Sequence, residues 1–257
     1  MSDFKYLFQD KYQNQFGGIT FTAFTDLLKT LNEKYYVSSI QIIESASFSL
    51  AMVIRSHLGL SAEGGKIGII AKDNLAGSLA LAAARRLYNA GTNSTIIIPQ
   101  KELGTLSKDF QLQAEAVSAL GLELLVIDPK ENEDSLNELF QSSDNVLMGT
   151  FDNNAYKDDN LNFLADMLNE LSTPIHSIIC PHGICQDTGK KLSTPIYSSS
   201  TLSLGIPLSG LNGANDFLGR HYICEISVPK EEAKLLANIP ETLFSEQPVC
   251  QIFKKKD

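Results

Sequence analysis

The chain has 257 residues, of which 43% are hydrophobic and 20% are charged, an ordinary composition for a globular protein. Its 21 Lys and Arg against 30 Asp and Glu give a formal charge of −9, which argues against direct nucleic-acid binding through a basic face. No apolar run approaches the ~20 residues that span a bilayer, and residues 1–15 lack the pattern of a secretory signal. The four cysteines are too few for a disulfide scaffold. We therefore expect a single cytoplasmic domain that does not enter a membrane.

Two helices are expected near the start of the chain. Apolar residues recur at helical spacing over 21–31, which predicts an amphipathic helix. A capping-box pattern, Ser38 followed by Gln41, precedes a second periodic run of apolar residues over 42–54. Together these segments define a helical N-terminal arm at about 20–58.

Between residues 66 and 228, short β-rich runs alternate with helical stretches. The predicted strands cover 67–70, 94–98, 122–127, 145–149, 175–180, 201–204 and 222–228, and the predicted helices cover 78–90, 106–120, 135–141 and 161–171. This alternation predicts an α/β fold, a Rossmann-like three-layer α/β/α sandwich with a mostly parallel sheet. A C-terminal tail is expected over 229–257, with Lys254, Lys255 and Lys256 forming a frayed, solubilising end.

The sequence contains none of the common nucleotide-binding or hydrolytic motifs. It has no G-x-G of the dinucleotide fingerprint, and neither Gly65-Lys66 nor Gly189-Lys190 is followed by the Ser or Thr of a P-loop. The nucleophile elbow G-x-S-x-G and the zinc motif H-E-x-x-H are also missing. We therefore predict no bound cofactor and no metal site, and we assign no catalytic residue.

Ligands of parallel α/β sheets bind beyond the carboxyl ends of the strands, near the point where the strand order reverses. This rule directs attention to three loops, 71–78, 150–155 and 181–189. Backbone amides at the start of the helix near residue 78 favour an anion there. The candidate ligand-binding residues in these loops are Lys72, Asp73, Asn74, Gly77, Ser78, His182, Gly183, Cys185 and Asp187.

Two side-chain clusters in the loops have alternative interpretations. Cys180, His182 and Cys185 follow one strand and could form a thiolate–imidazole pair or a soft metal site. The simpler interpretation is a buried cysteine at a strand end followed by loop residues of no special role. The second cluster, Asp152, Asp158 and Asp159, could bind a cation through oxygen ligands, although such a run more often forms a solvated turn and a helix N-cap.

Five stretches of the chain carry a family resemblance. They are IIESASFSLA (42–51), KIGIIAKDNLAGSLALAAARRLYNAG (66–91), PIHSIICPHGICQDTGK (174–190) and the pair TLSLGIPLSGL (201–211) and YICEISVP (222–229). In this order and spacing they resemble the YjeF N-terminal domain family, whose enzymatic members are NAD(P)H-hydrate epimerases, also called apolipoprotein A-I-binding-protein homologues. The third stretch is similar to the family's P-S-G-x-D-x-D-T-G segment and keeps Pro181, Gly183, Asp187, Thr188 and Gly189. The resemblance covers about residues 20–228.

The resemblance implies a site whose key residues are replaced here. In the family, the loop G-P-G-N-N-G-G-D-G holds the hydrated nicotinamide ribosyl group and a potassium ion through its asparagines and aspartate. Those three positions fall on Leu75, Ala76 and Leu79, and the cation-binding aspartate of the V-D-A-L-F-G segment falls on Met148. Leucine and methionine neither ionise nor bind potassium, so we do not expect ordinary epimerase activity.

Three further family positions also differ. The serine of P-S-G falls on His182, the acid/base aspartate that follows it falls on Cys185, and the lysine of the later P-K segment falls on Leu208. Cysteine and histidine can exchange protons, but the amide and cation contacts of the family are missing around them.

We therefore interpret the chain as a catalytically altered YjeF N-terminal-like domain, a pseudoenzyme that acts as a homodimeric small-ligand-binding or assembly module. A nucleotide-like small molecule is the candidate ligand, and the segments 21–31 and 42–54 are the expected subunit contacts. One alternative is an NAD(P)H-hydrate epimerase, an isomerase that repairs hydrated nicotinamide cofactor, with a rearranged site. Another is an mRNA-decapping-related scaffold module, because SLGIPLSGL (203–211) and GRHYICEISVP (219–229) resemble the C-terminal domain of the enhancer-of-mRNA-decapping scaffold more than the epimerases, and that domain also lacks the enzymatic loop.

Overall fold

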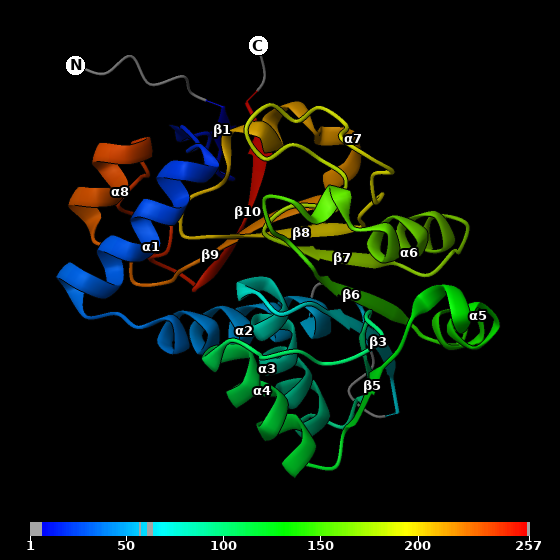
Figure 1. Ribbon diagram of the computed structural model, residues 1–257. Helices are drawn as coiled ribbons and strands as arrows, with labels where there is room; N and C mark the ends of the chain where they lie inside the picture. Colours follow the sequence, from blue (N-terminus) through cyan, green and yellow to red (C-terminus); the bar gives the residue numbers. More distant parts are fainter. Residues whose placement is uncertain (1–6, 57, 61–63, 256–257) are drawn as a thin grey trace.

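The computed structural model describes residues 7–56, 58–60 and 64–255. Lys256, one of the three lysines of the expected basic tail, lies outside these ranges, as do the first six residues. Within them, α-helices and strands alternate along most of the chain (Figure 1).

The described strands form one sheet, ordered β2-β1-β10-β9-β8-β7-β6-β3-β4-β5. All pairs from β9 to β5 are parallel, and those joining β9, β10, β1 and β2 are antiparallel. The strands are β1 (Phe8–Gln9), β2 (Gln15–Phe16), β3 (Lys66–Ala71), β4 (Asn93–Ile98), β5 (Glu123–Val126), β6 (Asn145–Gly149), β7 (Ile175–Ile178), β8 (Ser200–Leu204), β9 (Arg220–Cys224) and β10 (Val249–Lys254). The mostly parallel sheet confirms the predicted α/β class.

Helices cover both faces of the sheet, and α2, α3 and α4 group on one face while α5 and α6 lie on the other (Figure 1). The α-helices are α1 (Phe21–Tyr35), α2 (Ser39–Ser56), α3 (Leu75–Asn89), α4 (Lys108–Ala119), α5 (Glu133–Gln141), α6 (Asp159–Asn169), α7 (Asn215–Leu218) and α8 (Lys230–Ala237). The described residues also form the short 3-10 helices η1 (Pro129–Glu131), η2 (Ala155–Lys157) and η3 (Ser209–Gly213). This arrangement is the three-layer α/β/α sandwich that the alternating pattern predicts.

The central strands are apolar on both faces, because each face is covered by helices. In β3, Ile67 and Ile69 pack into the core cluster that includes α2, α3 and α4, whereas Ile70 packs into the cluster formed with α5 and α6. Successive side chains of a strand point to opposite faces, so the run of isoleucines serves both layers.

The two predicted N-terminal helices are present. The capping box is confirmed, since the Ser38 amide donates to Gln41 Oε1 over 2.8 Å and the Gln41 amide donates to Ser38 Oγ over 3.4 Å. Thr20 caps α1 by accepting the Ala23 amide at 3.2 Å.

The expected frayed end is wrong for the part of it that is described. Residues 249–254 form β10, with Lys254 opposite Phe8, and the Lys255 amide donates to the Leu7 carbonyl oxygen over 3.0 Å. The physical reason is that β9 would otherwise present an unpaired edge, which β10 covers. The segment before β10 contributes α8, which the sequence analysis did not predict.

Two predicted strands end two or more residues earlier than expected. The strand predicted over 222–228 ends at Cys224, and the strand predicted over 175–180 ends at Ile178. Ile179 has a φ of 70°, which a β-branched residue adopts only with strain, and the chain leaves the sheet there.

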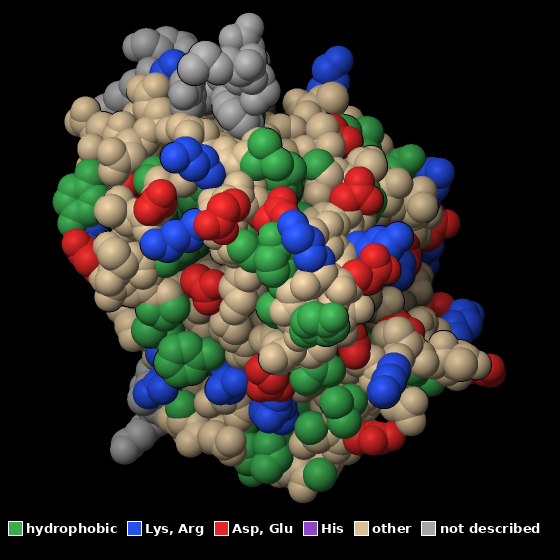
Figure 2. All heavy atoms as spheres, turned by 90° about the vertical axis from the view of Figure 1, so that its left-hand side faces the viewer, with side chains coloured by type: hydrophobic (Ala, Val, Ile, Leu, Met, Phe, Trp, Pro, Cys, Tyr) green, Lys and Arg blue, Asp and Glu red, His purple; other side chains and the backbone are tan. Residues whose placement is uncertain are grey.

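No single helix in the described ranges is long and apolar enough to cross a membrane; α1 and α2 together pass such a test only as a pair bent by 118°. On the face that carries α1 and α8, acidic and basic side chains are interspersed with scattered hydrophobic ones (Figure 2). The negative charge of the chain is therefore not gathered into one acidic patch on this face.

Candidate functional site

The strand order reverses between β3 and β6. From β3 the chain continues to β4 on one side, and from β6 it continues to β7 on the other. The loops that follow β3, β6 and β7 therefore leave the same edge of the sheet side by side. This is the switch point at which open α/β sheets bind their ligands, and it contains all nine candidate residues.

Most polar side chains of the loop after β3 hold the loop itself. Asp73 accepts hydrogen bonds from the backbone amide and the hydroxyl of Ser107, at the start of α4. Asn74 caps α3 by accepting the Gly77 amide at 2.9 Å, and the buried Ser78 hydroxyl donates to the Asn74 carbonyl oxygen. These residues position the first turn of α3 against the strand ends.

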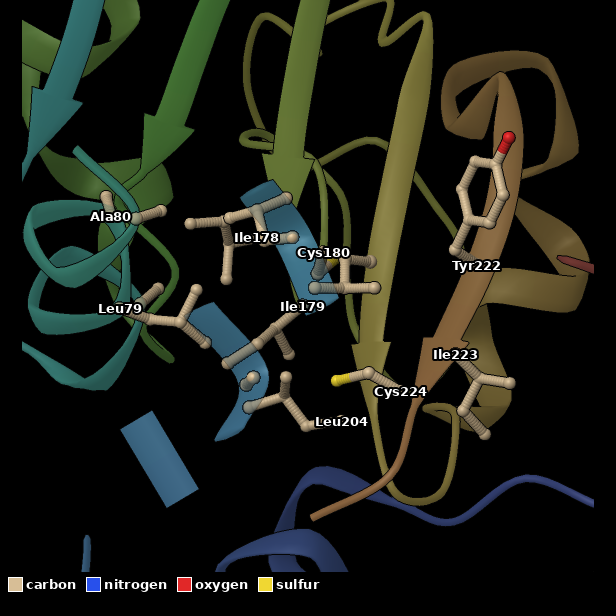
Figure 3. Packing of buried hydrophobic residues seen from close by; sticks show 14 of the residues in the cluster. Leu79, Ala80, Ile178, Ile179, Cys180, Leu204, Tyr222, Ile223 and Cys224 are labelled. Atoms are coloured by element: carbon tan, nitrogen blue, oxygen red, sulfur yellow. The ribbon is translucent and has the colours of Figure 1, made fainter. Parts of the chain in front are cut away.

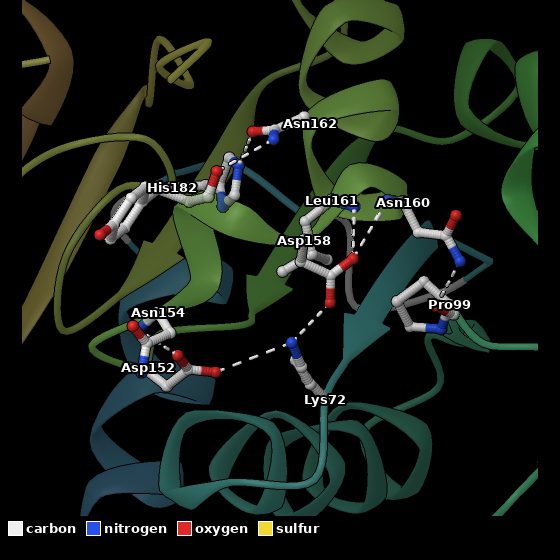
Figure 4. Close-up of polar contacts among 10 residues, drawn as sticks. Lys72, Pro99, Asp152, Asn154, Asp158, Asn160, Leu161, Asn162 and His182 are labelled. Atoms are coloured by element: carbon white, nitrogen blue, oxygen red, sulfur yellow. Dashed lines mark hydrogen bonds and ion pairs between the residues drawn. The ribbon is translucent and has the colours of Figure 1, made fainter. Parts of the chain in front are cut away.

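Lys72 lies between two carboxylates that come from different elements (Figure 4). Its Nζ is 2.5 Å from Asp158 Oδ2 and 3.7 Å from Asp152 Oδ2. The other oxygen of Asp158 accepts the amides of Asn160 and Leu161, so the expected N-cap of α6 is confirmed. Asp159, the third acidic residue of the predicted cluster, is exposed in the first turn of α6.

His182 is 5% exposed and lies beside this charged group. Its Nε2 is 2.9 Å from Asn162 Oδ1, and Asn162 Nδ2 donates to the Tyr156 carbonyl oxygen, which fixes the orientation of the amide. Nε2 therefore carries the proton, and Nδ1 is an acceptor with no partner in the described part of the chain. Burial lowers the pKa of His182 to about 4, with a smaller lowering by Lys72, although Asp158 and Asp152 act in the opposite direction, so the ring is neutral at neutral pH.

The cysteines of the loop after β7 differ in environment. Burial raises the pKa of the Cys180 thiol well above its usual range. Partial burial would also raise the pKa of Cys185, but hydrogen bonds from the Thr188 hydroxyl and from the backbone amides of Asp187 and Thr188 outweigh it and lower that pKa. No hydrogen bond joins His182 to Cys185 among the described contacts, so the structure does not form the thiolate–imidazole pair.

The remaining candidate residues of this loop shape it and tie it to the N-terminal arm. Gly183 has a φ of 77°, and a Cβ there would lie 2.3 Å from the Thr194 carbonyl oxygen. Asp187 accepts the Phe21 amide at 2.6 Å, at the start of α1. Gln186 Nε2 donates to Asn153 Oδ1 over 2.5 Å, which joins the loops after β6 and β7.

Three of the apolar residues at the family's binding positions are part of the core, and the fourth, Leu75, is partly buried against it. Leu79 and Ala76 are fully buried in α3, and Met148 is 2% exposed in β6. Leu79 packs with its neighbour Ala80 near Ile178 at the end of β7 (Figure 3). These side chains cannot reach a ligand at the strand ends.

The residues present do not fit a potassium ion or another resident metal. Among the described residues there is no group of three or more His, Cys, Asp or Glu that could hold one. Two carboxylates at the switch point, Asp152 and Asp158, already face the Lys72 ammonium.

A family model for the YjeF-related protein N-terminus matches residues 39–210, two thirds of the chain. The chain belongs to this family. The matched segment of the YjeF-related domain begins at the first residue of α2 and includes the loops after β3, β6 and β7. It thus contains the whole candidate site, whereas β9, α8 and β10 lie beyond it.

Two known proteins place this YjeF-related chain further. It is 25% identical over 209 residues to the bifunctional NAD(P)H-hydrate repair enzyme Nnr of Dictyoglomus turgidum, a match that covers 80% of this chain and 39% of that enzyme. The chain thus spans about two fifths of the length of that relative. The crystal structure of yeast YNL200c superposes with a TM-score of 0.75 at 17% identity, covering 93% of this chain and 99% of the yeast chain, which shows that the fold is shared.

The sequence patterns do not mark Asn162, Asn153 or Gln186 as site residues. Asn162 lies one turn after the N-cap of α6, and Gln186 lies within the predicted third loop. Their positions near the candidate acidic and histidine residues in the sequence could have indicated them. However, amide side chains are common in loops, and a hydrogen bond between two loops leaves no pattern in the sequence.

Proposed function

We propose that this protein is a catalytically altered YjeF-related domain, a pseudoenzyme that acts as a homodimeric small-ligand-binding or assembly module. The observation that carries the proposal is the burial of Leu79 and Met148 in the core, at positions where the family resemblance implies aspartates. An apolar side chain neither transfers a proton nor ligates a cation. Epimerising a hydrated nicotinamide ring needs a side chain that transfers a proton.

Two buried polar atoms support the ligand-binding part of the proposal. Asn74 Nδ2 is a donor and His182 Nδ1 is an acceptor, and neither has a partner within residues 7–56, 58–60 and 64–255. Buried polar groups without partners are rare and cost about 1–3 kcal/mol each. A nucleotide-like molecule with both an acceptor and a donor at its edge would satisfy them.

The catalytic part is tested with the R epimer of hydrated NADH. Purified protein is incubated with it, and the appearance of the S epimer is followed by chromatography beside an authentic epimerase and a protein-free sample. We expect the same rate as in buffer alone. Conversion at a rate comparable to that of the authentic enzyme would refute the proposal.

The ligand-binding part is tested by thermal unfolding with NAD⁺, ADP-ribose and AMP. A ligand that binds only the folded protein raises the unfolding midpoint, and the stabilisation grows with the logarithm of one plus its concentration divided by Kd. Asn74→Ser is the informative variant, because serine also caps a helix but lacks the amide donor. We expect the shift to shrink in Asn74→Ser and to persist in Asn169→Ser, an amide on α6 that bonds Pro195 and Tyr197 instead. No shift with any of the three molecules would contradict nucleotide-like binding.

The alternative is an epimerase with a rearranged site. One observation favours it: four ionisable residues gather at the switch point, namely Lys72, Asp152, Asp158 and His182. They do so although this chain has apolar residues at the positions that align with the family's catalytic and cation-binding side chains. If the epimer assay detects conversion, His182→Gln should abolish it, because the neutral imidazole is the best-placed proton acceptor of the four. An active His182→Gln variant would exclude this arrangement.

A further inference from the structure

The switch point has a positive charge of its own. Lys72 lies in the loop between β3 and α3. Its Nζ contacts one carboxylate oxygen of Asp152, in the loop after β6, and one of Asp158, the N-cap of α6. Its side chain is 29% exposed, and those of Asp152 and Asp158 are 34% and 27% exposed. The loop after β3 and the segment 152–158, which are distant from each other in sequence, therefore meet at one ammonium group.

Each carboxylate divides its two oxygens in the same way. Asp158 uses Oδ1 for the amides of α6 and turns Oδ2 to Lys72. Asp152 uses Oδ1 for the Asn154 amide, at 2.6 Å, and likewise turns Oδ2 to Lys72. Loop geometry thus fixes both outward-facing oxygens around one point, which Nζ occupies.

We propose that Lys72 is a built-in cation that takes over at this site the charge-neutralising role of a bound metal ion. Without a cation, two fixed carboxylates facing one partly buried point would repel each other and pull the loop after β6 away from α6. The covalently attached ammonium removes this repulsion and leaves a monovalent ion with nothing to neutralise. This proposal concerns the stability of the fold and stands whether or not the protein binds a nucleotide.

The test compares unfolding midpoints in potassium chloride and in choline chloride of equal ionic strength. The wild-type protein is expected to unfold at the same temperature in both. Lys72→Met keeps the length of the side chain and removes its charge, and we expect its midpoint in choline chloride to fall by roughly 5 °C. Potassium should restore a substantial part of this loss, because it can enter between the two free oxygens. Lys157→Met, an exposed lysine in η2, is the matched control and should shift by less than about 1 °C in either salt.

A second variant separates the repulsion that Lys72→Met exposes from any loss of packing. In Lys72→Met/Asp152→Asn one of the two carboxylate charges is removed, so we expect a higher midpoint than for Lys72→Met in choline chloride and no response to potassium. A wild-type protein stabilised specifically by potassium would overturn the proposal. So would a Lys72→Met variant that behaves like Lys157→Met or that potassium does not stabilise.

Discussion

At the scale of single residues, Gly77 illustrates how closely the loop after β3 packs on α3. A Cβ at this position would lie 1.8 Å from the carbonyl oxygen of Lys72, and a backbone atom cannot rotate away. We expect Gly77→Ala to lower the free energy of unfolding by about 3 kcal/mol or more, although alanine favours helices elsewhere. Urea denaturation measures the loss. Gly104→Ala, with no atom within 4 Å of the added Cβ, should change stability by less than about 0.5 kcal/mol, and equal losses in both would contradict this account.

The same scale shows what the sequence could predict of the site. The three loops were predictable, because strand ends in a parallel sheet converge on one edge. The contacts within them were not, since Lys72 and Asp158 are separated by 86 residues and carry no shared pattern. The unpartnered Nδ1 of His182 was equally hidden, because it depends on which way Asn162 is turned.

At the scale of elements, β10 decides how the sheet ends. It pairs with β9 and β1, and its Val249 is fully buried whereas its Phe253 is 41% exposed. We expect Val249→Asp to destabilise the protein by about 3–5 kcal/mol, because the carboxylate would be buried without a partner. Phe253→Asp on the same strand should cost less than about 1.5 kcal/mol. Denaturation of the two variants side by side distinguishes loss of the strand from a general intolerance of charge there.

The elements that were predicted and those that were missed differ in length and pattern. Several of the parallel strands stand out because they contain runs of apolar residues bounded by turn formers, as at 67–70 and 94–98. The strands β1 and β2 have two residues each, too few to show any period. The strand β10 mixes exposed and buried positions at the end of the chain, and only its pairing with β9 identifies it.

At the scale of the whole molecule, three buried histidines make stability depend on pH. Burial lowers the pKa of His176 to about 4 and of His221 to about 3, and the pKa of His182 is also about 4. An unfolded histidine titrates near 6.5, so between about 4 and 6.5 the unfolded chain binds more protons than the folded one. The free energy of unfolding is therefore highest, as far as these histidines are concerned, above about pH 6.5 and falls as the pH drops. His176 alone accounts for at most about 3 kcal/mol of this decrease.

Denaturation at a series of pH values measures this slope. His176 lies between Asn145 and Ser200, which its two ring nitrogens contact at 2.7 and 2.9 Å. His176→Gln should be less stable at neutral pH, because one of these contacts is lost, yet it should lose less stability on acidification. An unchanged slope would show that the buried imidazole does not drive the acid sensitivity.

Also at the scale of the whole molecule, the exposed surface of α2 is where the proposed homodimer can be tested. Phe48 on α2 is 52% exposed, and the Arg86 guanidinium lies 5.7 Å from its ring centroid. Met52 borders the same hollow, which has a volume of about 440 Å³. Phenylalanine, methionine and arginine are enriched in protein interfaces, whereas charged residues are depleted at the buried centre, so a carboxylate introduced there would disfavour association.

We expect the wild-type protein to sediment as a dimer at micromolar concentration and Phe48→Glu to sediment as a monomer. Leu192→Glu, at a 43% exposed position in the loop between β7 and β8, should remain dimeric. A monomeric wild-type protein would remove the dimer from the proposal, and dimeric Phe48→Glu would move the contact away from α2.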